Sequence, residues 1–236
     1  MKKITSVAAL CLRLTWVRVL GLFAAVGVAQ WCAFTMSGEI ANEWTSFEYL
    51  LDRFPAWIGR GGFLFLSYIL IFTVAGGKGS KTGYTLRRLR VSEKTHTWIF
   101  ALVFAGYIVA YHAFQICMVL LLYGYYDQIH GFGRELLFLA AFRSEYFHFL
   151  LPLYEPWAVV LNGLMTLFSG VIMASIPREL RKGRSLLGFS LMLWSWTQNT
   201  GEMASQSRDI FMIVGMAITI VCCFLWLPRR NENEAD

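Results

Sequence analysis

Six long stretches without a single charged residue constrain this chain more than any other feature. Each runs for at least 17 residues without Asp, Glu, Lys or Arg. A membrane-spanning helix needs about 20 apolar residues, with a range of roughly 17–25, because the hydrocarbon core is about 30 Å thick. A charge at the centre of such a helix costs about 2.5–3.5 kcal/mol on insertion scales. We therefore predict six transmembrane helices, over 19–36, 61–76, 97–124, 156–176, 185–199 and 210–227.

The composition excludes the common classes of soluble protein. Hydrophobic residues make up 57% of the chain and charged residues only 15%, whereas soluble domains carry about 45–50% and about 25%. Disorder, a disulfide scaffold and an ordinary cytosolic enzyme are thus ruled out. The five cysteines lie inside or beside apolar stretches without a CxxC spacing, which argues against a metal site. We predict an all-α integral membrane protein in which residues 1–236 form a single transmembrane domain.

The distribution of basic residues predicts the orientation. If the N-terminus is cytoplasmic, 16 of the 21 Lys and Arg residues fall on the cytoplasmic side. Cytoplasmic loops of membrane proteins carry such an excess. We therefore expect both termini in the cytoplasm, with an amphipathic N-terminal helix leading into the first span. The net charge of +6 then reflects topology, so we expect the lipid bilayer, and no nucleic acid, as a partner.

A short basic segment lies between the predicted second and third spans. Leu86 and Leu89 are three residues apart, with Arg87, Arg88 and Arg90 around them. This spacing predicts a short amphipathic helix on the cytoplasmic side. It could rest on anionic lipid headgroups or dock a cytoplasmic protein, and the spacing leaves both possibilities open.

The order of these parts resembles the membrane subunit of type-2 ABC exporters. The basic segment GYTLRRLRVS at 83–92 is similar to the coupling-helix region of small bacterial permeases in that family, and the outer stretches 134–144 and 151–153 are also similar to them. Family members usually carry re-entrant helices between spans five and six. Here 199–209 is too short for such a pair, and the extra outer residues lie between spans three and four instead.

The resemblance implies a function and a set of partners. The chain would be a multi-pass permease of the bacterial plasma membrane, without enzymatic activity or a cofactor of its own. A separate ABC ATPase would bind ATP and Mg, and a second permease copy or a paralogue would complete a dimer. The resemblance assigns the ATPase contact to six residues of the basic segment: Tyr84, Leu86, Arg87, Arg88, Leu89 and Arg90.

Two strips of polar residues lie along the third and fourth predicted spans and are candidates for a translocation path. The alternative is that they make interhelical hydrogen bonds, which contribute about 0.6 kcal/mol each on average. The strips consist of Tyr107, Tyr111, His112 and Gln115 on the third span, and Asn162, Thr166 and Ser169 on the fourth.

The outer segment 127–155 carries the residues for one alternative function, a membrane-embedded enzyme or metal site. Its carboxylates and histidines are Asp127, His130, Glu135, Glu145, His148 and Glu155. On a helix Glu145 and His148 would share one face, as metal ligands can. The apolar residues around them instead favour an interfacial helix whose charges face water. We expect no metal here, but a membrane-embedded enzyme or metal site is one alternative function. A non-catalytic membrane assembly or immunity factor is another.

Overall fold

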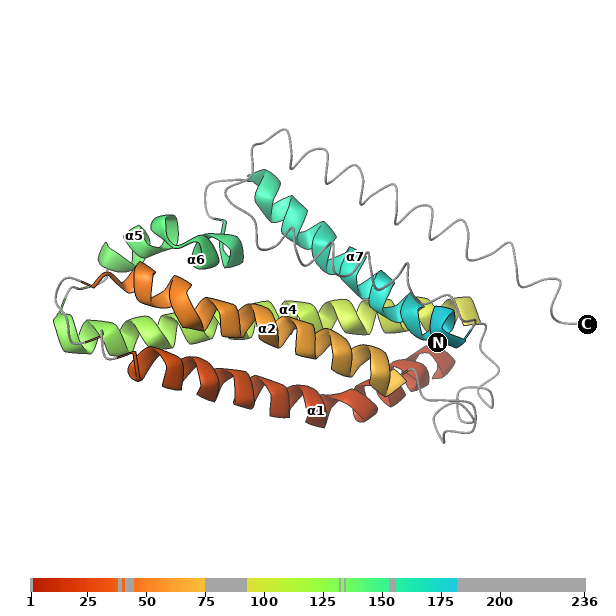
Figure 1. Cartoon of the computed structure of the whole chain (residues 1–236). Helices are drawn as coiled ribbons and strands as arrows, with labels where there is room; N and C mark the ends of the chain where they lie inside the picture. The colour runs from red at the N-terminus through yellow and green to blue at the C-terminus, as the bar shows by residue number, and fades with distance from the viewer. Residues whose placement is uncertain are drawn as a thin grey trace, which may run out of the picture. The chain divides into compact units, whose positions relative to one another are not determined.

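The computed structural model describes residues 2–37, 40, 45–74, 93–131, 133, 135–152 and 156–181. The predicted fifth and sixth spans and the basic segment 84–90 lie outside this part. Within it the chain is almost entirely helical, and Figure 1 colours the helices in chain order. These helices are α1 (Lys2–Thr35), α2 (Phe47–Val74), α4 (Glu93–His130), α5 (Glu135–Arg143), α6 (Glu145–Leu150) and α7 (Pro156–Arg181).

Four of these helices are long and apolar enough to cross a membrane. They contain the candidate spans Thr5–Thr35, Phe47–Thr73, Thr95–His130 and Pro156–Ile176. The all-helical fold is therefore confirmed in the described part of the chain, and each of the four candidate spans overlaps one of the first four predicted spans, whose bounds stay a prediction. The protein is a multi-pass membrane protein.

The helices extend beyond the charge-free stretches that predicted them. The N-terminal helix and the first span form one continuous helix, α1, and α2 begins at Phe47, well before the predicted residue 61. Charges limit which residues lie in hydrocarbon but do not end a helix. Asp52, Arg53 and Arg60 therefore belong to the first half of α2.

The described helices form two compact units, which we describe separately. The first contains the described residues of 1–16, 70–108 and 157–236. In it α7 packs closely on α4 at Gly170, where an added Cβ would lie 2.7 Å from the backbone oxygen of Ala101. The hydroxyl groups of Thr15 and Tyr107 form a hydrogen bond of 2.8 Å in the same unit. Close backbone approach at a glycine is thus what sets the spacing of α4 and α7.

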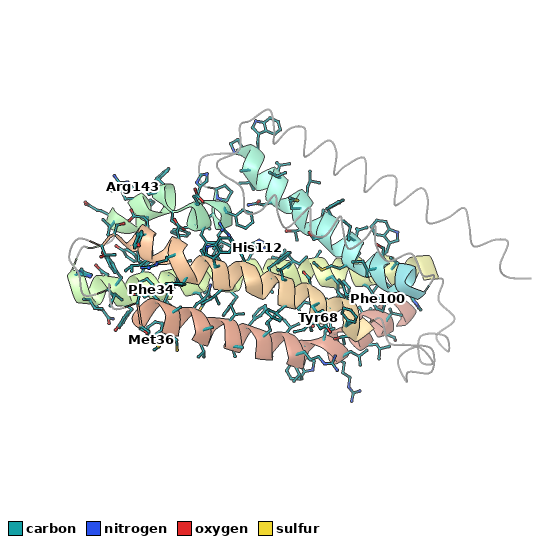
Figure 2. The ribbon with its side chains drawn as sticks, in the orientation of Figure 1. Phe34, Met36, Tyr68, Phe100, His112 and Arg143 are labelled. Atoms are coloured by element: carbon teal, nitrogen blue, oxygen red, sulfur yellow. The ribbon has the colours of Figure 1, made fainter. Side chains whose placement is uncertain are left out.

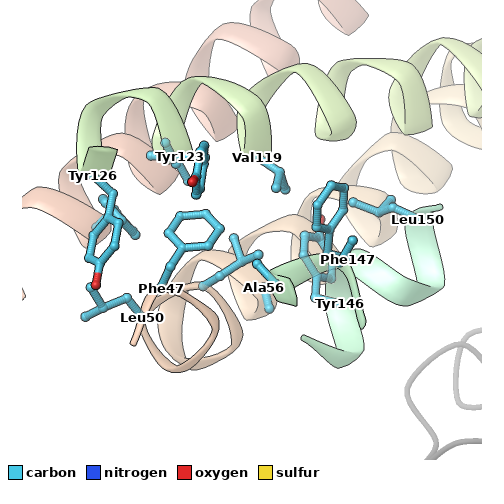
Figure 3. Packing of buried hydrophobic residues seen from close by; sticks show 14 of the residues in the cluster. Phe47, Leu50, Ala56, Val119, Tyr123, Tyr126, Tyr146, Phe147 and Leu150 are labelled. Atoms are coloured by element: carbon cyan, nitrogen blue, oxygen red, sulfur yellow. The ribbon is translucent and has the colours of Figure 1, made fainter. Parts of the chain in front are cut away.

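The second unit, residues 17–69 and 109–156, is built around an aromatic core. The Phe47 ring meets the ring of Tyr123 edge-on at 5.2 Å and packs in a tilted arrangement on that of Tyr126 at 5.5 Å. Figure 3 shows Tyr146 and Phe147 of α6 reaching the same cluster from the other end. Edge-on aromatic pairs add about 0.5–1.5 kcal/mol beyond the burial of their area. The core thus joins α2 to α4 and includes buried side chains of α6.

We predict that Gly170→Ala destabilises the protein and that Gly163→Ala does not. A Cβ at position 170 would press on the backbone of α4, whereas one at position 163 of the same helix meets nothing within 4 Å. Overpacking costs about 1–3 kcal/mol, while Ala in place of Gly in an open helix position gains about 0.5–1 kcal/mol. Thermal unfolding of the two purified variants in detergent measures the difference. Equal unfolding midpoints would contradict this account of the α4–α7 contact.

Candidate functional site

Two buried glutamines join three helices of the second unit. Gln30 of α1 and Gln115 of α4 are 2% and 1% exposed. The Gln30 Nε2 group donates one hydrogen bond to the Pro55 carbonyl of α2, at 2.9 Å, and another to Gln115 Oε1, at 2.8 Å. Leaving one such buried polar group without a partner would cost about 1–3 kcal/mol. We call Gln30 and Gln115 the glutamine pair.

The Pro55 carbonyl fixes the orientation of both amides. A carbonyl oxygen can only accept, so Gln30 must present its Nε2 group to Pro55. Gln115 then offers Oε1 to Gln30, and the same oxygen accepts a second hydrogen bond from the Tyr146 hydroxyl, at 2.7 Å. Gln30 Oε1 and Gln115 Nε2 have no hydrogen-bond partner among the described residues. The site therefore contains one buried acceptor, Gln30 Oε1, and one buried donor group, Gln115 Nε2, that make no hydrogen bond to the described residues.

Tyr146 brings the short helix α6 to the glutamine pair. Its side chain is 3% exposed. Burial raises the pKa of Tyr146 above its ordinary value, while hydrogen bonding at the glutamine pair and the positive charge of Arg60 lower it by less. At neutral pH the hydroxyl is therefore protonated and acts as a donor.

Two glycines of α2 make room for tyrosine hydroxyls. A Cβ at Gly59 would overlap the hydroxyl of Tyr146 and lie 3.0 Å from Gln115 Oε1. A Cβ at Gly62 would overlap the hydroxyl of Tyr111, which donates to the Gly59 carbonyl at 2.6 Å. Any larger residue at these two positions would force the tyrosines away from α2.

Asp52 of α2 binds the N-terminal end of α6. Its carboxylate accepts a hydrogen bond of 2.7 Å from the Ser144 hydroxyl and bonds of 3.2 Å from the backbone N–H groups of Glu145 and Tyr146. Ser144 is the N-cap of α6 and accepts from the N–H of Phe147. A carboxylate at a helix N-terminus satisfies donors that have no partner within the helix. The helix α6 is thus fixed at its beginning by Asp52 and at its side by Tyr146.

The structure brings together only part of the predicted polar strips. Tyr111 and Gln115 belong to the hydrogen-bonded site, and the His112 ring lies 5.9 Å from the Phe149 ring of α6 (Figure 2). Tyr107 lies in the other compact unit, where it bonds to Thr15.

The fourth-span strip also belongs to that other unit. Thr166 donates to the carbonyl of Asn162 one turn earlier in α7, at 2.9 Å, and Ser169 is buried. A bond within one helix uses the Thr166 donor without involving a second helix. The six residues assigned to the ATPase contact, from Tyr84 to Arg90, lie outside the described residues.

Two of the carboxylates and histidines of 127–155, Asp127 and His130, bond to the backbone of nearby segments. Asp127 accepts from the Gly133 N–H at 2.7 Å, and His130 Nε2 lies 2.7 Å from the Ile40 carbonyl. Glu145 and His148 lie on α6 as predicted, while Glu155 is not among the described residues. Within the described ranges, no three His, Cys, Asp or Glu residues come together to hold a metal ion.

Sequence reasoning missed several members of the site, among them Gln30, Gly59 and Tyr146. Gln30 carried a usable signal, since an amide inside a charge-free stretch must find a partner in the bundle. Gly59 precedes a charged residue and falls outside the predicted second span. Tyr146 carried no signal at all, because only the folding of α6 onto α2 and α4 brings it to Gln115.

No protein-family model, curated protein or solved structure matches this chain. The chemistry of the site must therefore be argued from its own residues. Two amides and a protonated tyrosine offer hydrogen bonds, and none of the three changes its charge near neutral pH. Such a site can bind and position uncharged polar groups.

We predict that Tyr146→Phe and Gln115→Leu are energetically coupled. Either change breaks the same hydrogen bond, so the double variant should be more stable than the sum of the single effects implies. The coupling should be about 0.5–1.5 kcal/mol, measured by thermal unfolding of the four proteins in detergent. Tyr107→Phe is the matched control, since its hydrogen bond lies in the other unit. Additive effects of Tyr146→Phe and Gln115→Leu would contradict the assigned hydrogen bond.

Proposed function

We propose that this chain is the membrane-spanning permease subunit of a bacterial ABC exporter. The observation that carries the proposal is the glutamine pair, which lies buried across three helices long enough to cross a membrane. Polar residues inside membrane spans are costly and mark substrate pathways more often than the surrounding apolar residues do. The predicted basic segment between α2 and α4, where the resemblance locates the ATPase contact, adds to this support.

The proposed mechanism needs partners for this chain. A separate ATPase binds ATP and Mg and contacts the segment from Tyr84 to Arg90. Closure of two ATPases tilts two permease copies, or this chain and a paralogue, between inward-facing and outward-facing states. The chain crosses the plasma membrane six times with both termini in the cytoplasm. In this orientation the connections that carry α5 and α6 lie on the outer side.

We predict that Leu86→Asp together with Leu89→Asp releases the ATPase. If the segment docks in a protein groove, each buried leucine contributes about 1.5–3 kcal/mol. The tagged chain should copurify an ABC ATPase from its native cells, and the double variant should insert in the membrane but lose that ATPase. Quantitative mass spectrometry of the purified samples measures the ratio.

The matched variant Arg87→Gln with Arg88→Gln separates docking from lipid contact. Its effect on copurification should be smaller and should grow with salt concentration, because exposed charges are screened. An aspartate variant that keeps its ATPase at full stoichiometry would show that the segment is not the coupling element. A wild-type chain that brings down no ABC ATPase would overturn the proposed function itself.

A further inference from the structure

The helix α6 is short and is attached to α2 and α4 by a few polar contacts and by its buried side chains. It is six residues long, and the α5–α6 region begins after Gly131 and Gly133, which both have positive φ angles of 69° and 73°. Glycine adopts such angles without strain. The Gly133 backbone is bonded to the Asp127 carboxylate and the Tyr123 hydroxyl, so these positions can act as a hinge only when those bonds break. The polar attachment of α6 to α2 and α4 includes the Asp52 contacts and the Tyr146 hydroxyl. Separate polar contacts of this kind can break and reform.

We propose that α6 is a latch over the glutamine pair and that Tyr146, seated against Gly59, is its locking residue. The proposal rests on the proposed function only for the reason to open, since an exporter must expose its pathway on the outer side. The locking geometry is specific. Tyr146 can reach Gln115 only because position 59 lacks a side chain.

The hydrogen-bonding state of the closed site indicates what the open site would bind. With the latch closed, Gln30 Oε1 and Gln115 Nε2 are buried without partners in the described part of the chain. When Tyr146 withdraws, Gln115 Oε1 loses one of its two donors as well. The open site then offers both donors and acceptors, without a charge on either amide. These groups match a hydroxyl or an amide group on an otherwise apolar molecule.

A buried cysteine can report the opening of the latch. Ala56 of α2 is 1% exposed and belongs to the cluster that Tyr146 and Phe147 cover (Figure 3). The Ala56→Cys change would be made in the full chain after replacing its five native cysteines. The purified protein in detergent would then be treated with a water-soluble maleimide, so the measurement depends neither on membrane orientation nor on a transport partner.

Gly59→Ala and Gly61→Ala form a matched pair for this test. Both add one methyl group to the same helix, but only the one at position 59 meets Tyr146, while the one at position 61 meets nothing within 4 Å. We expect Gly59→Ala to raise the labelling rate roughly tenfold, since it removes the locking hydrogen bond. Gly61→Ala should leave the rate unchanged.

Tyr146→Phe gives a second test without a steric clash. It removes only the hydroxyl, so the labelling rate should rise by a few-fold even if Gly59→Ala does not fold. Equal rates for the wild type, Tyr146→Phe and Gly61→Ala would overturn the latch. Faster labelling in a chain that copurifies no ABC ATPase would support the latch and overturn the exporter function, so the two proposals fail separately.

Discussion

The hydrogen bonds of Gln30 connect the helices of the second unit. One amide group of α1 donates to the backbone of α2 and to a side chain of α4. In a hydrocarbon environment water cannot replace either partner, so separating these helices would leave several polar groups unsatisfied. The apolar side chains around them gain little from burial in a membrane, because lipid tails are as apolar as leucine. Polar contacts and close packing therefore carry the specificity of this unit.

Close packing depends on small residues at chosen places. Gly59 and Gly62 admit the hydroxyls of Tyr146 and Tyr111 to the surface of α2, and Gly170 admits the backbone of α4 to α7 in the other unit. Helix propensity alone would favour alanine at each of these positions. It therefore does not explain why glycine is required there. Gly61 lies beside Gly62 and two residues from Gly59, yet a Cβ there would meet nothing within 4 Å, so the requirement is local.

The sequence predicted the helices better than their ends or their contacts. Each of the first four charge-free stretches falls on a long apolar helix, because charges are excluded from hydrocarbon. The helix α2 nevertheless begins at Phe47 and includes Asp52 and Arg60, because charges do not end a helix. The helical segments of the 127–155 region were also expected from their apolar residues, and the structure forms α5 and α6 there.

The contacts of the site were harder to predict. Gln115 and Tyr111 stood out as polar residues within a span. Gln30 lies 85 residues from Gln115, and Tyr146 lies 31 residues from it. No periodicity within one helix encodes such pairings, since they arise only when separate helices pack. The orientation of the two amides, and hence which of their atoms lack a partner, depends on where the Pro55 carbonyl lies. A sequence does not show that position.

The central claim is that the glutamine pair holds α6 in place, and hydrogen–deuterium exchange of the intact chain in detergent tests it most directly. The Gln115→Leu variant removes the acceptor of Tyr146 while leaving the Asp52 contacts and the aromatic core. We predict that the backbone amides of α6 exchange several-fold faster in this variant than in the wild type, while those of α7 are unchanged. Unchanged exchange in α6, or equal acceleration in α6 and α7, would contradict the claim.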